Sequence, residues 1–527
     1  MERASDLNFH MGQLFLDSMK RRPDAICQID HATGEQETNA SVLKRSIRLA
    51  RCFRKLGFKP GDVLALGGRN HMDLFIPYYA ALMNGLPIVG VDPLFKFDEI
   101  NTVIKTTRPK VAFCQKENYC DFVKAAEQAN IDTKVFTFDG ENPMAELIEQ
   151  YDDNSPIDDF QVATFDLSKI YAWLVSSGGT TGIIKFAAFT HMAWFQKMMS
   201  PALTMFNKKK AEELTPRNGL HISPIQWISG FFNPIIMPLT KMTRVQSSSP
   251  NLTTGDIIDM INIYKPATVM MSPTLASSMI KHEKVCDFAC FNMVILTGGK
   301  VYPDVWSEVQ KRTREDAAVF EIYGQTENLG PIFLPNPKGP VGNCGKRSDA
   351  VLVKLIDPDT GKEITEPGVP GELWTKGICF AEYYNNPEET AKAFTEDGWF
   401  KTGDLLYRDA EDNFFFVERL KMVIKNRGYT IVPPEIEEVI RQHEGVYDVS
   451  VTSVDDADEG DLPVACVVRN KGANVTAQEI KDLVASKLSA SKQLRGGVAF
   501  MDALPMTSAG KIARAKLKTM VADLQRE

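Results

Sequence analysis

The sequence predicts an α/β fold, followed by a smaller antiparallel unit and a compact α+β segment. From about residue 45 to residue 350, short apolar runs end in small or turn residues and precede stretches with helical periodicity. Strands that alternate with helices are typical of parallel sheets covered on both faces. Beyond residue 350 the pattern changes to hairpins, and beyond Arg419 to mixed helix and strand patterns. We therefore place a domain boundary near residue 418.

Individual runs predict particular elements. The clearest parallel strands are expected at residues 88–91, 268–271, 294–296 and 319–322. In the antiparallel unit, strands are expected at residues 351–356 and around Leu373, with a polar turn at residues 357–362 after the first of them. A helix is expected to open at Pro433. Its inward-facing stripe would comprise Ile436, Val439, Ile440 and His443.

The composition excludes several classes of protein. A net charge of −8, with 44% hydrophobic and 24% charged residues, is typical of a globular protein and not of a disordered or fibrous one. The basic residues form no stripe for nucleic acid, and the most apolar run, residues 228–239, is too short for a membrane span. The nine cysteines show no zinc or redox spacing, so we expect reduced, mostly buried thiols. We expect a monomer or weak homodimer in the cytoplasm, or in the peroxisome if a terminal Ser-Lys-Leu type signal was lost.

A loop rich in glycine and threonine follows the strand predicted at residues 171–175. Convergent backbone amides, hydroxyl donors and a closing lysine suit a polyphosphate. The candidate ATP-binding residues of this loop are Ser177, Gly179, Thr180, Thr181, Gly182 and Lys185. The loop is not a Walker motif, because no glycine precedes Lys185 and no Ser or Thr follows it. A flexible surface turn is the alternative interpretation of the loop taken alone.

This loop resembles the phosphate loop of the adenylate-forming superfamily, which contains acyl-CoA synthetases, beetle luciferases and the adenylation domains of peptide synthetases. The family pattern Ser-Gly-Thr-Thr-Gly-x-Pro-Lys-Gly is matched at Gly179, Thr180, Thr181, Gly182 and Lys185. Three positions depart from it, since Gly178 replaces a serine, Ile184 the proline and Phe186 the final glycine. The loss of one hydroxyl donor predicts slower handling of pyrophosphate.

A second motif follows the next predicted strand. It reads Tyr323-Gly324-Gln325-Thr326-Glu327 and is similar to the family's Tyr-Gly-x-Thr-Glu. The ring of Tyr323 can stack on adenine, Thr326 can bond a phosphate oxygen, and Glu327 offers a hard oxygen ligand for magnesium. For this motif taken alone, a strand-to-loop turn with a solvated acid is the alternative.

Two further motifs lie on either side of the predicted boundary. The one that ends at Asp404 resembles the family's Trp-x-x-Thr-Gly-Asp, and its carboxylate is suited to accept hydrogen bonds from two ribose hydroxyls. The next matches the family's hinge and the glycine loop that lines its thiol tunnel. The resemblance assigns Arg419 to nucleotide binding and Lys425 to catalysis. It assigns Glu418, Lys421 and Gly428 to the hinge or the thiol tunnel. Glu418 replaces the usual aspartate, and a solvated basic face is the alternative for the lysines.

The last motif, at residues 505–514, resembles the family signature Pro-x-Thr-x-x-Gly-Lys-x-x-Arg. Its Lys511 can bring positive charge to carboxylate and α-phosphate oxygens, where the transition state accumulates charge. The resemblance covers nearly the whole chain. It implies an N-terminal domain at residues 1–418, built of two doubly wound sheets and a small β-barrel-like unit at about 340–418, and a small mobile α+β lid at 419–527.

The resemblance implies a reaction in two steps. A substrate carboxylate attacks the α-phosphorus of ATP and magnesium pyrophosphate leaves; the lid then rotates, and a thiol attacks the acyl carbon and releases AMP. We therefore predict an ATP-dependent acyl-CoA synthetase that uses Mg²⁺, ATP and coenzyme A. Its partner is a small-molecule carboxylic acid, fatty or aryl-alkyl. The similarity is greatest to insect luciferase-like acyl-CoA synthetases and coumarate-CoA ligases.

Two segments are expected to form the acyl pocket. Gly298 and Gly299 match the family's glycine pair beside the acyl chain, and Lys300 follows them. Lys300 points either toward a polar substrate tail or, as we favour, toward solvent. Gln226 and Trp227 stand where luciferases carry paired histidines. Trp227 either walls off the acyl site or packs in the core.

Three other functions remain open from the sequence. A luciferase would oxidise an adenylated luciferin, although the missing histidines argue against a strong emitter. An enzyme that loads a carrier protein would not form acyl-CoA from free coenzyme A. A non-catalytic sensor would bind AMP or ATP without turnover, but Glu327, Asp404, Arg419 and Lys511 are all retained.

Overall fold

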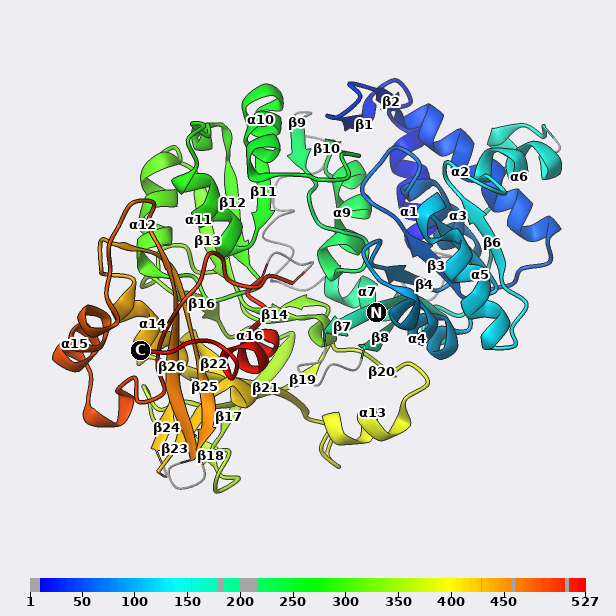
Figure 1. Ribbon diagram of the computed structural model, residues 1–527. Helices are drawn as coiled ribbons and strands as arrows, with labels where there is room; N and C mark the ends of the chain where they lie inside the picture. The colour runs from blue at the N-terminus through cyan, green and yellow to red at the C-terminus, as the bar shows by residue number, and fades with distance from the viewer. Residues whose placement is uncertain are drawn as a thin grey trace.

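The computed structural model confirms the α/β fold class, with a large N-terminal part built on sheets and a separate C-terminal domain (Figure 1). The structure describes residues 10–152, 154–178, 184–198, 217–427, 429–456, 460–507 and 511–527. In Figure 1 the chain runs from a blue and cyan region through a green sheet to the orange and red C-terminal domain.

The first large sheet belongs mainly to the blue and cyan region. In spatial order its strands are β20 (Glu382–Tyr383), β8 (Ile184–Thr190), β7 (Tyr171–Gly178), β4 (Ile88–Val91), β3 (Leu64–Gly67), β5 (Val111–Cys114) and β6 (Lys134–Thr137). Strands β7, β4, β3, β5 and β6 are parallel, whereas β8 and β20 are antiparallel to their neighbours. All residues of β3, β4 and β5 are buried, as expected for parallel strands covered on both faces.

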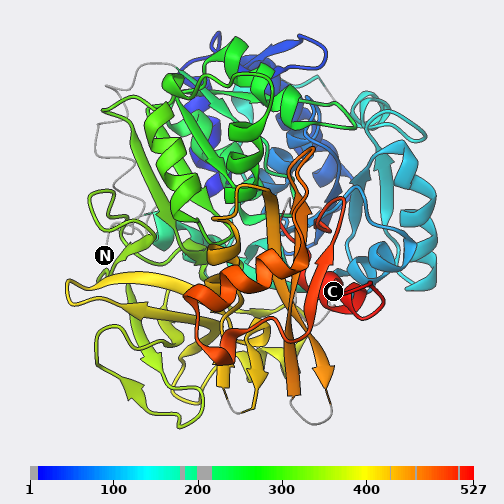
Figure 2. The same cartoon turned by 60° about the vertical axis from the view of Figure 1, so that its left-hand side comes forward.

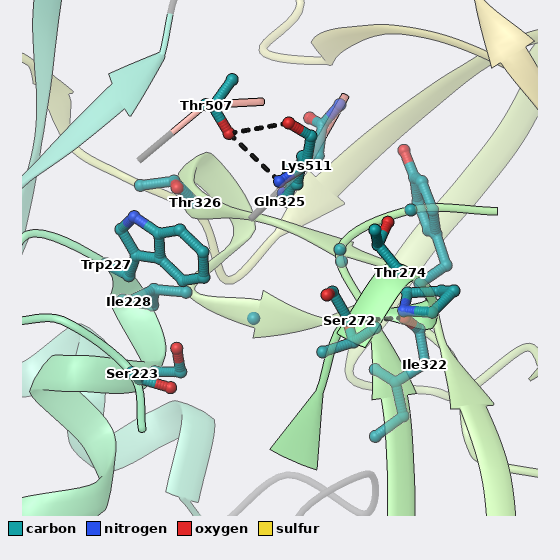
Figure 3. Close-up of a pocket in the computed structure, with 18 of the residues that line it drawn as sticks. Ser223, Trp227, Ile228, Ser272, Thr274, Ile322, Gln325, Thr326, Thr507 and Lys511 are labelled. Atoms are coloured by element: carbon teal, nitrogen blue, oxygen red, sulfur yellow. Dashed lines mark hydrogen bonds between the residues drawn. The ribbon is translucent and has the colours of Figure 1, made fainter. Parts of the chain in front are cut away.

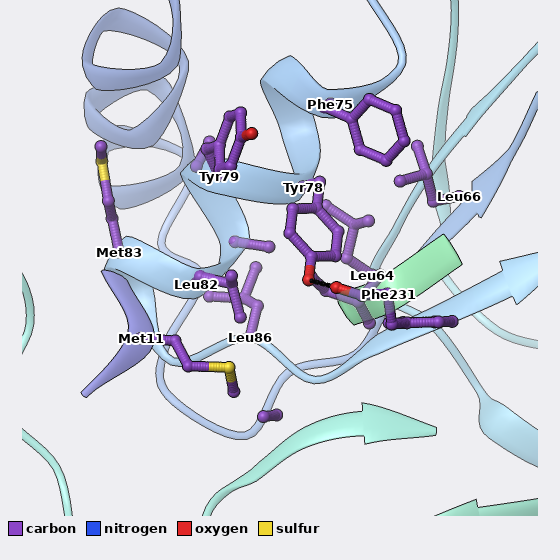
Figure 4. Close-up of a cluster of buried hydrophobic side chains, with 14 of the residues drawn as sticks. Met11, Leu64, Leu66, Phe75, Tyr78, Tyr79, Leu82, Met83, Leu86 and Phe231 are labelled. Carbon is purple, nitrogen blue, oxygen red and sulfur yellow. Dashed lines mark hydrogen bonds between the residues drawn. The ribbon is translucent and has the colours of Figure 1, made fainter. Parts of the chain in front are cut away.

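Helices cover this first sheet. They are α1 (Met11–Lys20), α2 (Asn39–Lys55), α3 (Phe75–Asn84), α4 (Phe97–Thr107), α5 (Tyr119–Gln128), α6 (Met144–Tyr151), α7 (His191–Met198) and α9 (Ile228–Leu239). Helix α3 is buried along its whole length, and Figure 4 shows its aromatic side chains in the core. The Tyr78 hydroxyl donates to the carbonyl of Phe231 at 2.6 Å, and Tyr79 donates to that of Pro234 at 2.8 Å. These bonds satisfy both buried hydroxyls and fix α9 against the core.

The second large sheet is also mostly parallel. In spatial order its strands are β13 (Ala318–Ile322), β12 (Met293–Thr297), β11 (Thr268–Met271), β9 (Arg217–Leu220), β10 (Met242–Gln246), β1 (Ile26–Asp30) and β2 (Gln36–Thr38). Three helices cover one face, α10 (Thr254–Tyr264), α11 (Pro273–Lys281) and α12 (Pro303–Arg312). The predicted strands at residues 88–91 and 268–271 have the predicted bounds, and those at 294–296 and 319–322 each lie within a slightly longer strand.

An antiparallel sheet of six strands follows. In spatial order they are β16 (Asn343–Lys346), β22 (Asn413–Arg419), β21 (Phe400–Arg408), β19 (Gly371–Gly377), β17 (Val351–Ile356) and β18 (Glu363–Ile364). Three of its pairings contain register shifts, which bend and coil a sheet. Helix α13 (Pro387–Ala393) precedes β21 in the chain. A short hairpin of β14 (Gly324–Gln325) and β15 (Gly330–Pro331) precedes β16.

The C-terminal domain has its own sheet and core. Its elements are β23 (Ile424–Asn426), β24 (Tyr429–Ile431), α14 (Pro433–Ile440), β25 (Val446–Asp456), β26 (Gly460–Arg469), α15 (Ala477–Lys487), β27 (Gly497–Phe500) and α16 (Arg514–Val521). The prediction that His443 extends the stripe of α14 is wrong, because the helix ends at Ile440. The His443 carbonyl and ring instead accept hydrogen bonds from the backbone of Val446 and Gly445 in a turn.

The C-terminal domain lies against the N-terminal part, in front of it in Figure 2. The Tyr302 hydroxyl donates to buried Glu437, Lys281 donates to the Tyr447 carbonyl, and Arg514 lies 3.7 Å from Glu418. In the part of the chain that the structure describes, no helix has the length and apolarity needed to cross a bilayer. All nine cysteines are free thiols and most are buried, as predicted.

Candidate active site

A cavity of about 1480 Å³ lies where the second parallel sheet, the antiparallel sheet and the C-terminal domain meet. Residues at the C-terminal ends of β11, β12 and β13 line it, where open α/β sheets place their ligands. Figure 3 shows Trp227 on one side, Ser272 and Ile322 on the other, and Thr507 and Lys511 of the C-terminal domain above them. The two parts of the chain therefore share one site.

Asp404 is a buried acid at the centre of a hydrogen-bond network. The register of β21 and β22 places it opposite Arg419. Its Oδ2 accepts hydrogen bonds from the Tyr323 hydroxyl at 2.8 Å and from Gln325 Nε2 at 2.5 Å. Its Oδ1 lies 3.4 Å from Arg419 Nε and accepts no hydrogen bond from the described residues. Burial raises the pKa of Asp404, although the charge of Arg419 acts in the opposite direction. Its Oδ1, which has no donor among the described residues, is suited to accept a hydrogen bond from a hydroxyl such as that of ribose.

Tyr323 is one of the two side chains that donate a hydrogen bond to Asp404. Its ring is 8% exposed and packs against Phe333 and Phe416, with both ring centroids 5.9 Å away. Burial, followed by the adjacent carboxylate of Asp404, raises its pKa far above the ordinary value, so it stays a hydrogen-bond donor. The described contacts give Tyr323 a role in orienting Asp404, and stacking of its ring on adenine stays a prediction.

Glu327 is another buried acid that lines the cavity. It lies in the short 3₁₀ turn Thr326–Asn328, directly after β14. Its Oε1 accepts hydrogen bonds from Ser177 Oγ at 2.5 Å and from the Tyr383 hydroxyl at 2.8 Å. Within the described ranges no group of three or more His, Cys, Asp or Glu could hold a metal ion. A lone carboxylate fits Mg²⁺, which takes one or two protein carboxylates and otherwise binds water and substrate phosphates.

The phosphate loop is described only at its two ends. Ser177 lies in β7 and Lys185 in β8, where the two residues are register partners. Lys185 forms an ion pair with Glu389, and its Nζ lies 5.1 Å from the centre of the Tyr383 ring. The predicted residues Gly179, Thr180, Thr181 and Gly182 lie outside the described residues.

Lys511 enters the cavity from the C-terminal domain. The Thr507 backbone amide donates to the Lys511 carbonyl at 2.7 Å, and the Lys511 amide donates to Thr507 Oγ1 at 3.2 Å. Its Nζ lies 5.8 Å from the centre of the Trp227 ring, and a Cβ atom at Gly298 would be only 3.0 Å from its Cε. Burial, then the charge of Arg419, lowers the pKa of Lys511 to about 8, against the opposing charge of Asp404.

The predicted acyl residues also line the cavity. Gln226 is 5% exposed; its carbonyl accepts from Ser176 Oγ at 2.9 Å, and its Oε1 accepts no described hydrogen bond. Trp227 precedes α9 and presents its ring to Lys511. Gly298 and Gly299 are exposed at the end of β12, and Lys300 is half-buried with its Nζ 6.0 Å from the Tyr302 ring.

Comparison with known proteins identifies the family. The family model for AMP-binding enzyme matches residues 15–385, and that for the AMP-binding enzyme C-terminal domain matches residues 435–511. The chain belongs to the AMP-binding enzyme family. The predicted membership of the adenylate-forming superfamily is therefore confirmed.

Relatives of this AMP-binding enzyme match over most of their length. Luciferin 4-monooxygenase of Luciola mingrelica is 30% identical over 520 residues, with 93% of this chain and 90% of the relative covered. 4-Coumarate–CoA ligase-like 9 of Arabidopsis thaliana is 27% identical, with 94% and 87% covered. The crystal structure of ATP-bound MatB from Rhodopseudomonas palustris has a TM-score of 0.85 at 22% identity, with 98% and 99% covered, and shows the same fold.

The predicted hinge residues Glu418 and Lys421 line the cavity, whereas the predicted catalytic Lys425 does not. Glu418 is buried and Lys421 lines the cavity. Lys425 does not line it; its side chain is 58% exposed, and its Nζ donates to Thr430 Oγ1 at 2.9 Å. Gly428 lies outside the described residues. Of the two lysines predicted to be catalytic, the structure thus brings Lys511 to the cavity and leaves Lys425 exposed.

Sequence reasoning did not single out several residues of the site. Gln325 occupies the variable position of its motif, and Tyr383 belongs to no motif, so neither had a signal beyond its neighbours. A buried cluster of Tyr302, Glu437 and Arg514 was also missed. Burial disfavours the charged form of Glu437, but the charge of Arg514 and the hydrogen bonds prevail and lower its pKa. Arg514 closes the last motif, which is the one signal that could have pointed to it.

Proposed function

We propose that this enzyme is an acid–thiol ligase that activates a carboxylic acid as its acyl adenylate and transfers the acyl group to coenzyme A. The observation that supports this most directly is that Asp404, Glu327 and Lys511, far apart in the sequence, line one cavity. Polar recognition of a nucleotide needs the first two, and charge stabilisation at the reacting atoms needs the third. The relatives named as CoA ligases favour coenzyme A as the acceptor.

In the first half-reaction the substrate carboxylate attacks the α-phosphorus of ATP, and the bond to pyrophosphate breaks. Asp404 Oδ1 has no hydrogen-bond donor among the described residues and would accept a ribose hydroxyl, and the charge of Arg419 beside it opposes the rise in pKa that burial causes. Lys511 would place its ammonium between carboxylate and α-phosphate, where negative charge accumulates. Thr326, at the start of the turn that holds Glu327, would bond a phosphate oxygen.

Magnesium would be held by Glu327 together with the phosphates of the nucleotide. When bound, it supplies positive charge to the pyrophosphate leaving group. The chain's contribution is to fix the orientation of Glu327 by the hydroxyls of Ser177 and Tyr383. Tyr383 remains protonated, because burial raises its pKa well above the ordinary range.

In the second half-reaction a thiol attacks the acyl carbon, the bond to AMP breaks, and the thiol proton passes to solvent. The Lys511 side chain occupies the cavity in this structure, so the thiol needs the C-terminal domain to move. We propose that the domain rotates at Glu418 and brings Lys425 and Gly428 toward the site. Both residues would then take the place that Lys511 leaves.

The decisive experiment is ATP–pyrophosphate exchange over a panel of fatty, aromatic and luciferin carboxylates, followed by AMP release that depends on coenzyme A. Exchange with at least one acid, and AMP release on adding the thiol, are expected. Exchange without thiol-dependent AMP release would indicate transfer to a carrier protein. Binding of ATP without exchange for any acid would indicate a sensor and contradict the proposal.

Luciferin oxidation is a second candidate, because relatives named luciferin 4-monooxygenase align with over 90% of this chain. Gln226 and Trp227 stand at the histidine positions of luciferases, so we expect at most weak light. Light emission with synthetic luciferin, ATP and oxygen, measured against acyl-CoA formation by the same preparation, separates the two activities.

A further inference from the structure

The cavity beneath Lys511 continues as an apolar slot between α9 and the second parallel sheet. From α9, the side chains of Phe232, Ile236 and Thr240 recur every four residues and line one wall. From the sheet, all four residues of β11 and the alternate residues Met293, Ile295 and Thr297 of β12 line the other wall. The residues that define this methionine slot are Ile236, Met237, Met242, Met270, Met293 and Ile295.

The sheet wall is a face that α10, α11 and α12 do not cover. Val269 and Val294 point into the core shared with those helices. Met270, Met293 and Ile295 belong instead to a small apolar cluster on the other face. Met270 and Met293 on this face are only partly buried, so a ligand in the slot would complete their burial.

The slot is deep and leads away from the reacting end. The cavity-lining residues of β12 run from Thr297, beside Gly298, down to Met293, which at about 3.3 Å per residue is a depth of about 13 Å. On the other wall, α9 from Ile228 to Leu239 extends about 18 Å at 1.5 Å per residue. A narrow, elongated substrate fits this shape.

Two thioether side chains close the far end. A Cβ atom at Gly219 of β9 would lie 3.1 Å from Met237 Cε and 3.3 Å from Met242 Sδ, so both methionines pack onto this glycine. Thr268 is the register partner of Gly219, and its hydroxyl donates to Met242 Sδ at 3.5 Å. Met237, Met242 and Thr268 thus form the floor of the slot.

The hydroxyl groups along the slot are already bonded within the protein. Thr240 Oγ1 donates to the Ile236 carbonyl at 2.7 Å, Thr297 Oγ1 donates to the Ile322 carbonyl at 2.9 Å, and Thr268 Oγ1 donates to Met242 Sδ. Because each of these hydroxyls donates within the protein, none offers a proton to the slot, and an acceptor group on a substrate ring would be left without a partner among them, at a cost in binding. Methionine is unbranched and adaptable, which suits a flexible chain better than a rigid ring.

From this geometry we infer that the acid is an unbranched aliphatic carboxylate whose chain lies in the methionine slot and whose carboxylate lies under Lys511. The inference rests on the proposed function, since it names the substrate class of the same site. Chain length is set by the floor at Met237, Met242 and Thr268. Each methylene added up to the floor should improve binding roughly fourfold, because burying one contributes about that factor.

The test measures kcat/KM for ATP–pyrophosphate exchange with saturated acids from butyrate to stearate, and with benzoate, cinnamate and 4-coumarate. A rise with chain length to one optimum, above all three aryl acids, is expected. Preference for an aryl acid, or no dependence on length, would overturn the inference. If no acid supports exchange, the proposed function fails, and the slot is judged by calorimetric binding of the same alkanoates. Binding that tightens with chain length supports the slot, and no binding overturns it.

Variants of the slot should move the optimum in opposite directions. Met242→Ala removes part of the floor and should move the optimum to longer chains; Met293→Phe narrows the wall and should move it to shorter ones. Met279→Ala is the matched control, since Met279 is a fully buried methionine of α11 that does not line the cavity. It should lower the melting temperature without moving the optimum. An optimum unchanged in both slot variants, with thermal stability retained in either, contradicts the inference.

Discussion

The two halves of the cavity are built by different means. On the nucleotide side, Asp404 and Glu327 are each held by hydrogen bonds from neighbouring side chains. On the acyl side, the methionine slot is lined by flexible thioethers, and its hydroxyl groups bond inward. One half is a rigid, preorganised polar site and the other an adaptable apolar one.

This difference matches what each half must do. Adenylation depends on positioning charge where it develops, which requires polar groups that do not have to reorganise. Recognition of an alkyl chain depends on burying apolar area, which tolerates adaptation by the protein. We therefore expect substitutions on the polar side to reduce the rate of adenylation, and those on the apolar side to change which acid is used.

The largest effect is expected from Lys511→Ala. It removes the one ammonium from the C-terminal domain that approaches Trp227 and Gly298 among the described residues. Adenylation should fall roughly 100- to 1000-fold, as when a preorganised charge donor is lost, while thioesterification of a supplied acyl adenylate changes little. Single-turnover assays of the two halves measure this. Lys518→Ala is the control, because this half-exposed lysine of α16 does not line the cavity, and equal losses in both halves would contradict a lysine that serves one step only.

Asp404→Asn should have the next largest effect. It keeps the shape of the side chain but removes the charge that faces Arg419 and accepts from Tyr323 and Gln325. We expect kcat/KM for ATP to fall about 10- to 100-fold, the range for a hydrogen bond to a charged group, with a smaller change in the KM of the acid. Asp412→Asn, on the surface turn between the same two strands, should leave both constants near the wild-type values.

The pH dependence of adenylation should show the environment of Lys511. Burial lowers its pKa to about 8, so the ammonium loses its proton as pH rises through that value. In the free enzyme, kcat/KM for exchange should therefore be level below pH 8 and fall roughly tenfold per unit above it. Lys511→Arg should move this descent to higher pH, because a guanidinium does not deprotonate in this range. A descent at the same pH in both proteins would assign it to another group.

Trp227→Leu should have the smallest effect. It removes the aromatic face 5.8 Å from Lys511 Nζ, a contact worth about 0.5–1 kcal/mol when partly exposed. The rate of exchange should fall roughly two- to fivefold, and Trp227→Phe should recover part of the loss. A change in the KM for ATP alone would indicate that Trp227 contacts the nucleotide and would contradict its placement beside Lys511 and the acyl group.

The polar half could be predicted from sequence because its residues stand in short motifs. Each motif directly follows a strand or lies on one, and the sheets then bring Tyr323, Glu327 and Asp404 together. The short apolar runs also predicted the parallel strands, since a strand buried on both faces is uniformly apolar. His443 failed as part of a helical stripe because a turn ended the helix before it, which periodicity does not reveal.

The acyl half could not be predicted from sequence. Met242, Met270 and Met293 come from three different strands, and any one of them is indistinguishable in the sequence from an ordinary core residue. That they face a cavity and not the helices depends on the pairing of β11 with β12 and on the placement of α9. Tyr383 and Glu389 were missed for the same reason, because their partners Glu327 and Lys185 are distant in the chain.

Gly298 has a consequence that extends to the order of the two half-reactions. At its φ of +88° a Cβ atom would be strained, and it would lie 3.0 Å from Lys511 Cε, so the end of the lysine would have to shift. Alanine at this position should therefore displace the lysine and slow adenylation more than the step in which the thiol attacks. Such a protein would make its own intermediate slowly yet still consume one supplied from outside, a catalyst mainly for the second half of its own cycle. The absence of a side chain at Gly298 thus makes space for the lysine on which the first chemical step depends.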